Sequence, residues 1–125
     1  MDEYLLDTNI LSKIFYGKTD VKNFVDNLTV GVETIVYIEC IQDSISNTDK
    51  RRIKRSLQNI KFYPLTNDIA QKAIELIDTY SNSHGLLLAD AIIAATALEY
   101  DLTLITYNWK DFQFIKGLKL LKPTV

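Results

Sequence analysis

Cysteine, proline and glycine are scarce in this 125-residue sequence, and each shortage excludes something. The one cysteine, Cys40, excludes an internal disulfide and a zinc site built on several thiolates. Because Cys40 stands in an apolar run, we interpret it as a small buried hydrophobic residue rather than a nucleophile. Two prolines and four glycines leave few breaks that could mark a linker. We therefore expect a single domain spanning residues 1–125.

Long hydrophobic runs are absent as well. No stretch approaches the roughly 18–20 consecutive apolar residues of a membrane helix. The opening Met-Asp-Glu-Tyr-Leu-Leu has neither the basic region nor the apolar core of a signal peptide. We expect a cytoplasmic protein without a membrane partner.

A strong excess of one charge is also missing, since the net charge is −2. This balance does not favour a passive nucleic-acid binder, because such domains are usually basic. It is compatible with an enzyme that holds divalent cations over a group of carboxylates, since bound cations reverse the local charge.

The chain does contain a regular alternation of strand-like and helical patterns. The apolar stretch at residues 88–99 has hydrophobic residues on almost every side, so it should form a buried central helix. Alternation of this kind predicts a three-layer α/β/α domain with a central, mostly parallel sheet. The expected strands are 3–6, 30–32, 62–65, 103–106 and 118–121, and the expected helices are 9–16, 20–28, 35–46, 49–61, 68–80 and 88–99.

Two acidic residues stand where parallel α/β sheets commonly build sites. Asp7 directly follows the first expected strand, and ligands bind outside the carboxyl ends of such strands. The alternative is that Asp7 only caps the next helix. Asp90 lies near the start of the apolar helix, where an ionised carboxylate is costly unless it is paired or bound to metal. The alternative is an ordinary acid stabilised by the helix dipole.

Two further acids complete the expected group. Glu39 is embedded in an otherwise apolar helical run, although a solvent-exposed face is the alternative because Tyr37 and Gln42 are also polar. Asp111 falls in the loop after the strand at 103–106, where acids are common for other reasons. A parallel sheet would converge the four carboxylates, and oxygen-only ligands favour Mg²⁺ or Mn²⁺. Such ions activate water and stabilise the leaving oxygen in phosphoryl displacement.

These segments resemble the PIN domain, and particularly the VapC-like toxins of bacterial toxin–antitoxin pairs. The resemblance lies in the order and spacing of 5–10, Glu39, 88–98 and 103–112, and it covers essentially the whole chain. It implies an endoribonuclease that cuts single-stranded regions of RNA and depends on Mg²⁺ or Mn²⁺. It also implies a homodimer that is inhibited by a cognate antitoxin reaching into the site.

The resemblance also assigns roles to individual residues. Asp7, Glu39 and Asp90 match the core acids of the family, and Asp111 is the preferred fourth acid. Three neighbouring polar residues match positions that support the acidic pocket or orient ligands and water: Asn9, Thr106 and Asn108.

The sequence departs from the family pattern on either side of Glu39. The family often has Ser or Thr three residues before this acid and Gly four residues after it. Here those positions hold Val36 and Asp43. The departures bear on the local shape near Glu39, and they remove none of the four acids.

A group of basic residues has two interpretations. Arg51, Arg52, Lys54 and Arg55 fall in one expected helix, which predicts a solvated face. The alternative is a surface that follows RNA phosphates or binds a partner protein.

Two ring-bearing residues could also take part in the chemistry. Trp109 could stack on a base, but we favour a role in closing the core. His84 is a weak candidate for a general base, because chemistry at two metal ions does not need one.

Two rival classes remain to be compared with the ribonuclease. A non-catalytic PIN-like module that binds RNA or protein would keep the fold without the reaction. A phosphoacceptor receiver domain has a similar length and fold class, but it needs paired acids after the first strand. Here Asp2 and Glu3 precede that strand, and Lys122-Pro123 leaves no room for a final helix.

Overall fold

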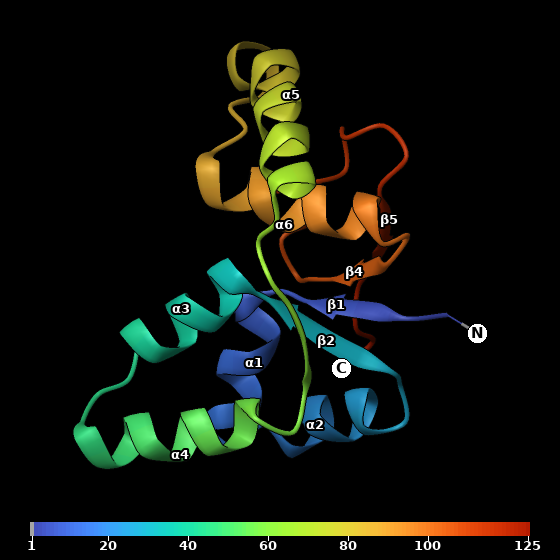
Figure 1. Ribbon diagram of the computed structural model, residues 1–125. Coiled ribbons are helices and arrows are strands. Elements are labelled where there is room, and N and C mark those ends of the chain that lie inside the picture. Colours follow the sequence, from blue (N-terminus) through green and yellow to red (C-terminus); the bar gives the residue numbers. More distant parts are fainter. Residues whose placement is uncertain (1) are drawn as a thin grey trace.

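The computed structural model describes residues 2–125, which form one parallel sheet between layers of helices (Figure 1). The strands are β1 (Tyr4–Leu6), β2 (Val30–Glu33), β3 (Lys61–Tyr63), β4 (Thr103–Ile105) and β5 (Lys119–Leu121). The helices are α1 (Thr8–Phe15), α2 (Thr19–Asp26), α3 (Thr34–Gln42), α4 (Asn47–Leu57), α5 (Asn67–His84) and α6 (Leu88–Glu99), with a short 3₁₀ helix, η1 (Trp109–Asp111).

The strand order is β3-β2-β1-β4-β5, and every neighbouring pair is parallel. This order confirms the predicted parallel sheet, and it differs from the 2-1-3-4-5 order of receiver domains, which excludes that class. The direction of the chain across the sheet reverses between β1 and β4. Ligands of open α/β sheets bind beside such a reversal, at the carboxyl ends of the strands.

The helices cover both faces of the sheet, as the predicted three layers require. Right-handed crossovers place the helices of the β1–β2–β3 half on one face and those between β3 and β4 on the other. In Figure 1, α1, α2 and α4 lie below the sheet, and α5 and α6 lie above it. Helix α3 packs against α1, α4 and α6, so it connects the two helical layers. Residues 91–97 of α6 are all buried, which confirms the predicted central helix.

The turn between α3 and α4 ends the first of these helices earlier than expected. Helix α3 stops at Gln42 rather than at residue 46, because the following residues already prepare the start of α4. The Ser46 hydroxyl accepts a hydrogen bond from the Asp49 backbone N–H at 3.0 Å, and the Asp49 carboxylate accepts one from the Ile45 N–H at 3.0 Å. This Ser-x-x-Asp pattern is a recognisable helix start.

The other boundary differences have local causes. Helix α5 runs four residues past the predicted end at residue 80 and stops at Gly85, whose φ of +70° suits glycine. The added Ser-Asn-Ser-His segment consists of poor helix formers, so local propensity did not predict it. Helix α4 starts two residues before and ends four residues before its expected bounds, and β3 covers 61–63 rather than 62–65.

The structure decides two questions about single residues. Cys40 is 4% exposed, and burial raises the pKa of its thiol to about 12, so it is a buried hydrophobic residue as predicted. The prediction that Trp109 closes the core is wrong, because its side chain is 38% exposed. Phe112 and Ile115 from the same segment occupy the core instead. No helix among residues 2–125 combines the length and apolar character that a membrane crossing requires.

Candidate functional site: acidic residues at the reversal of strand order

Asp7 connects the two central strands at the point where strand order reverses. It follows β1 directly, is 6% exposed, and donates its backbone N–H to the Ile105 carbonyl of β4 at 3.1 Å. One carboxylate oxygen, Oδ1, accepts from the Thr8 N–H at 2.8 Å and so caps α1. The other, Oδ2, accepts from the Thr106 hydroxyl at 2.8 Å. Asp7 therefore caps a helix, as its alternative interpretation stated, and is also held in place by β4.

Thr106 is the centre of a polar network beside Asp7. It follows β4 and is fully buried. Its hydroxyl donates to Asp7 and accepts from the Asn9 side-chain amide at 3.2 Å and the Asn108 backbone N–H at 3.0 Å. Asn9 also donates to Asp7 Oδ2 at 3.2 Å and accepts from the Tyr107 N–H at 3.3 Å. The structure thus brings all three expected supporting residues together, Asn108 through its backbone.

Glu39 reaches the same region from α3. Its Oε1 accepts a hydrogen bond from the Thr8 hydroxyl at 2.6 Å. Thr8 is therefore a shared partner, since its backbone N–H binds Asp7 and its side chain binds Glu39. The sequence interpretation did not single out Thr8. Its place directly after Asp7, at the start of a helix, was the available signal.

Asp90 and Asp111 complete the group electrostatically. Asp90 lies half-buried in the first turn of α6, and Asp111 is exposed in η1. Burial raises the pKa of Asp90 to about 6, and the negative charges of Asp7, Asp111 and Glu39 raise it further. The four carboxylates predicted from the sequence therefore lie within electrostatic reach of one another. Among residues 2–125, none of the four forms a salt bridge with Lys, Arg or His.

The pKa of Asp7 responds to the same group of charges. Burial raises it most, and hydrogen bonds from Thr106 and Thr8 oppose that increase. The charges of Glu39 and Asp111 raise it again. A cation beside these residues would relieve the repulsion between them.

Glu33 is an acidic residue that the sequence interpretation missed. It ends β2, is 0% exposed, and caps α3 by accepting the Val36 N–H at 2.6 Å. Burial raises its pKa to about 7, hydrogen bonds from the start of α3 lower it, and the charges of Glu39 and Asp7 raise it. Its place at the end of a strand, like that of Asp7, was the available signal.

The donors fit a divalent cation by charge and by atom type. Mg²⁺ and Mn²⁺ prefer carboxylate oxygens, and a group of uncompensated carboxylates gains most from a cation. Within residues 2–125, no three His, Cys, Asp or Glu side chains stand in a geometry that could hold a metal ion. An ion shared by several of these acids therefore requires their side chains to turn toward one another.

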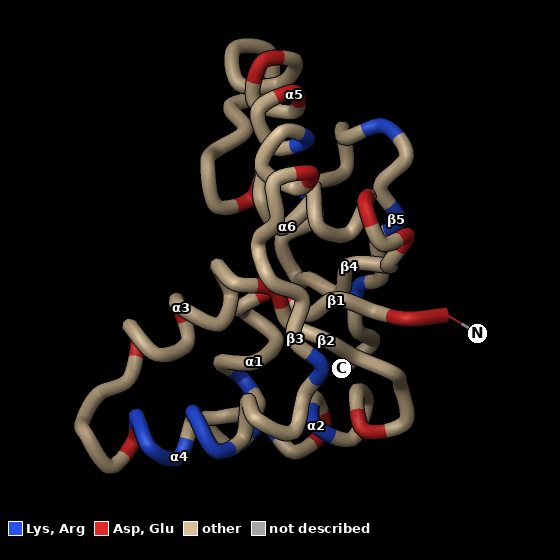
Figure 2. Tube along the Cα trace, in the orientation of Figure 1, with Lys and Arg blue, Asp and Glu red and all other residues tan. Residues whose placement is uncertain are grey.

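The basic residues of α4 divide into two kinds (Figure 2). Arg52 donates to the Phe15 carbonyl at 2.9 Å, pairs with Asp49 and lies over the Tyr16 ring, so it fastens α4 to the end of α1. Arg51 bonds the Thr48 hydroxyl at 3.3 Å. The side chains of Lys54 and Arg55 are exposed.

His84 lies at the end of α5. It stacks on the Phe114 ring with centroids 4.4 Å apart and shares a hydrogen bond with Ser83. These contacts give its ring a packing role.

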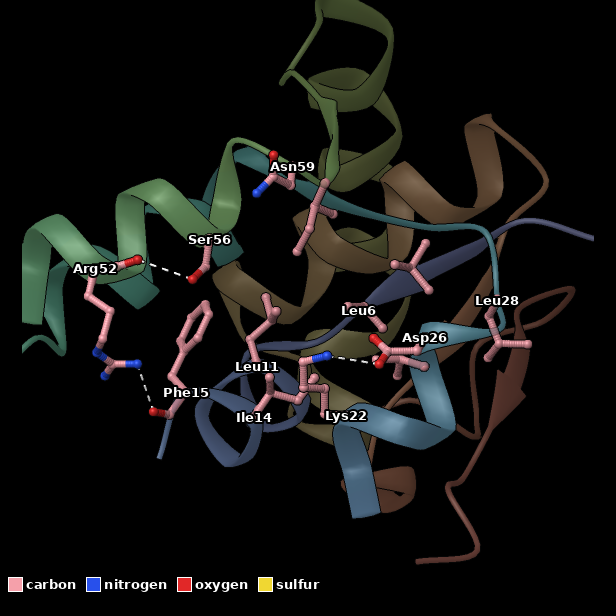
Figure 3. Close-up of a pocket in the computed structure, with 13 residues that line it drawn as sticks. Leu6, Leu11, Ile14, Phe15, Lys22, Asp26, Leu28, Arg52, Ser56 and Asn59 are labelled. Carbon is pink, nitrogen blue, oxygen red and sulfur yellow. Dashed lines mark hydrogen bonds and ion pairs between the residues drawn. The ribbon is translucent and has the colours of Figure 1, made fainter. Parts of the chain in front are cut away.

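A half-open apolar pocket of about 490 Å³ lies between α1, α2 and α4 (Figure 3). None of the four acids lines it. Leu11, Ile14 and Phe15 form part of its wall, and the Lys22–Asp26 ion pair and Arg52 lie at its edge.

A parallel α/β/α domain with an acidic site at the reversal of strand order is the class that this geometry defines. The sequence matches the PIN domain family over residues 4–117, and the chain belongs to that family. Ribonuclease VapC1 of Rickettsia felis is 29% identical over 127 residues, covering 94% of this chain and 93% of that protein. Ribonuclease VapC10 of Mycobacterium tuberculosis is 36% identical over 72 residues, covering 57% of this chain and 54% of that protein.

Solved structures agree with this assignment. A toxin–antitoxin complex from Klebsiella pneumoniae contains a chain 30% identical to this one, with a TM-score of 0.80 and coverage of 94% of this chain and 95% of that chain. VapBC2 from Rickettsia felis, solved with a promoter DNA fragment, gives 22% identity and a TM-score of 0.78, covering 97% of this chain and 98% of that chain. The second likeness supports the fold alone. The resemblance to VapC-like PIN proteins is thus confirmed.

Proposed function

We propose that this protein is a metal-dependent endoribonuclease and the toxin of a bacterial toxin–antitoxin pair, acting in the cytoplasm. The observation that carries the proposal is the mutual repulsion of four carboxylates from four elements, which lack salt-bridge partners within residues 2–125. The names of the relatives, ribonucleases VapC1 and VapC10, supply the reaction class.

In this proposal Asp7, Glu39, Asp90 and Asp111 hold Mg²⁺ or Mn²⁺. The ion, when bound, lowers the pKa of a water molecule and stabilises charge on the phosphate oxygens. The protein contributes orientation: Thr106 and Asn9 hold the Asp7 carboxylate from one side. Preorganised carboxylates of this kind reduce the reorganisation that the reaction requires.

The RNA would approach the site past η1. Trp109 is 38% exposed in the same turn as Asp111, so we propose that it stacks on a base near the cleaved phosphate. The exposed Lys54 and Arg55 of α4 could bind phosphate or a partner protein, whereas Arg52 is committed to contacts within the fold.

Protein partners would use apolar surfaces. We propose that an antitoxin segment occupies the half-open apolar pocket, since the solved relatives include toxin–antitoxin complexes. We also propose a homodimer. Ile38 of α3, Ile74 of α5 and Leu88 of α6 are 51%, 62% and 71% exposed, which is costly for large apolar side chains without a partner.

Cleavage of a structured RNA with single-stranded loops tests the proposed activity. We expect cleavage with Mg²⁺ or Mn²⁺, loss of cleavage with EDTA, and recovery when the ion is restored in excess. A folded protein that binds neither ion and cuts no RNA would favour the non-catalytic binding module instead. Cleavage that persists in EDTA would overturn the metal dependence and leave the ribonuclease.

A further inference from the structure

Glu33 combines complete burial with an incomplete set of hydrogen bonds. Its Oε1 caps α3, but its Oε2 is the buried side-chain oxygen that lacks any partner among residues 2–125. An unpaired buried charge is strongly unfavourable, whereas a protonated carboxyl is much less so. The local structure therefore favours the neutral form of Glu33 while no cation is nearby.

The register of the sheet places Glu33 beside the acidic site. Leu5 of β1 pairs with Gly31 of β2, so the residues two positions further along these strands are Asp7 and Glu33. From α3, Glu39 adds its negative charge, and from β3 the paired residue is Tyr63. Glu33 forms no salt bridge within the described part of the chain.

The capping contact also connects Glu33 to the placement of Glu39. Glu33 binds the first turn of α3, the helix that carries Glu39, and Glu39 in turn accepts the Thr8 hydroxyl. A shift of the first turn of α3 would move Glu39 relative to Asp7. Glu33 thus acts on the site through its neighbours.

We propose that Glu33 is a fifth acid of this site, a positioning residue that caps α3 and releases its proton when a divalent ion binds to the neighbouring carboxylates. The inference rests on the proposed metal-dependent function. The ion offsets the negative charge of Asp7 and Glu39, and this favours ionised Glu33. By reciprocity, ionised Glu33 strengthens binding of the ion. The proton passes from the Glu33 carboxyl to solvent.

Calorimetric titration with Mn²⁺ at pH 7, in buffers of different ionisation enthalpy, tests this coupling. With a pKa of about 7, Glu33 is about half protonated at this pH, so the wild type should release about half a proton per ion. Glu33→Gln keeps the shape and should release almost none. Its Mn²⁺ affinity should be roughly 3- to 10-fold weaker at pH 8 and should depend less on pH between 6 and 8.

Two further variants separate this role from capping. Thr66→Ala removes the cap of α5, where the Thr66 hydroxyl accepts the Ile69 N–H at 3.2 Å, and should leave proton release and Mn²⁺ affinity unchanged. Glu33→Ser retains a capping hydroxyl without an ionisable group, so it should lose proton release even if Glu33→Gln folds poorly.

The outcomes distinguish this inference from the function on which it rests. If the wild type binds Mn²⁺ and either Glu33 variant releases as many protons as the wild type, the role of Glu33 is overturned and the metal site stands. If the folded wild type binds no Mn²⁺, the proposed function and the coupling both fail.

Discussion

Asp90→Asn is expected to lower the rate of RNA cleavage by roughly 10³-fold, or about 4 kcal/mol of transition-state stabilisation. The substitution keeps the shape of the side chain and removes the charge that would hold the ion. Single-turnover cleavage of an RNA that the wild type cuts gives the rate directly. The exposed Asp78 of α5 supplies a matched control, and Asp78→Asn should cleave at the wild-type rate.

The stability of the same variant distinguishes a functional acid from a structural one. The pKa of Asp90 is raised in the folded protein, so the folded state holds this proton more tightly than the unfolded state. The contribution of Asp90 to stability therefore falls as pH rises from about 4 to about 6. At pH 7 to 8, denaturant unfolding of metal-free Asp90→Asn should show no loss of stability. A large loss would indicate that Asp90 serves the fold.

Thr106→Val is the second substitution with a large expected effect. It removes the buried hydroxyl that joins Asp7, Asn9 and the Asn108 backbone. We expect the free energy of unfolding to fall by about 1–3 kcal/mol, because polar groups lose their partner. Cleavage should slow by roughly 10- to 100-fold, because the Asp7 carboxylate loses its orientation. Chemical denaturation and single-turnover cleavage measure the two effects.

Thr96 supplies a control of equal burial for this variant. It is also fully buried, but its hydroxyl donates only to the Ile92 carbonyl within α6, at 2.8 Å. Thr96→Val should leave the cleavage rate within about twofold of the wild type, since this bond stays within the helix. Equal rates for Thr106→Val and Thr96→Val would contradict a role for the polar network in the reaction.

Patterns that extend over a whole element made the sheet and its central helix predictable. The apolar run at 88–99 has no polar side to expose, so only a buried position suits it. The position of Asp7 was equally informative, because a residue directly after a strand of a parallel sheet must lie at the site-forming edge. Both conclusions depend on the period and direction of the chain alone.

Features decided by a few tertiary contacts were not predictable in the same way. Trp109 and Phe112 are both large and aromatic, and only the path of the η1 turn determines that Phe112 enters the core. Ile38 lies in an apolar helix but faces outward, because Val36 and Cys40 occupy the inner face of α3. Glu33 looked like an ordinary residue between a strand and a helix until its burial was known.

A crystal structure with Mn²⁺, read from its anomalous difference map, tests the central claim most directly. We predict an ion bound by Asp7 and Asp90 together with Glu39 or Asp111, with the side chains turned inward to meet it. Mn²⁺ absent from these carboxylates, in a protein that still cleaves RNA in Mn²⁺, would contradict the account.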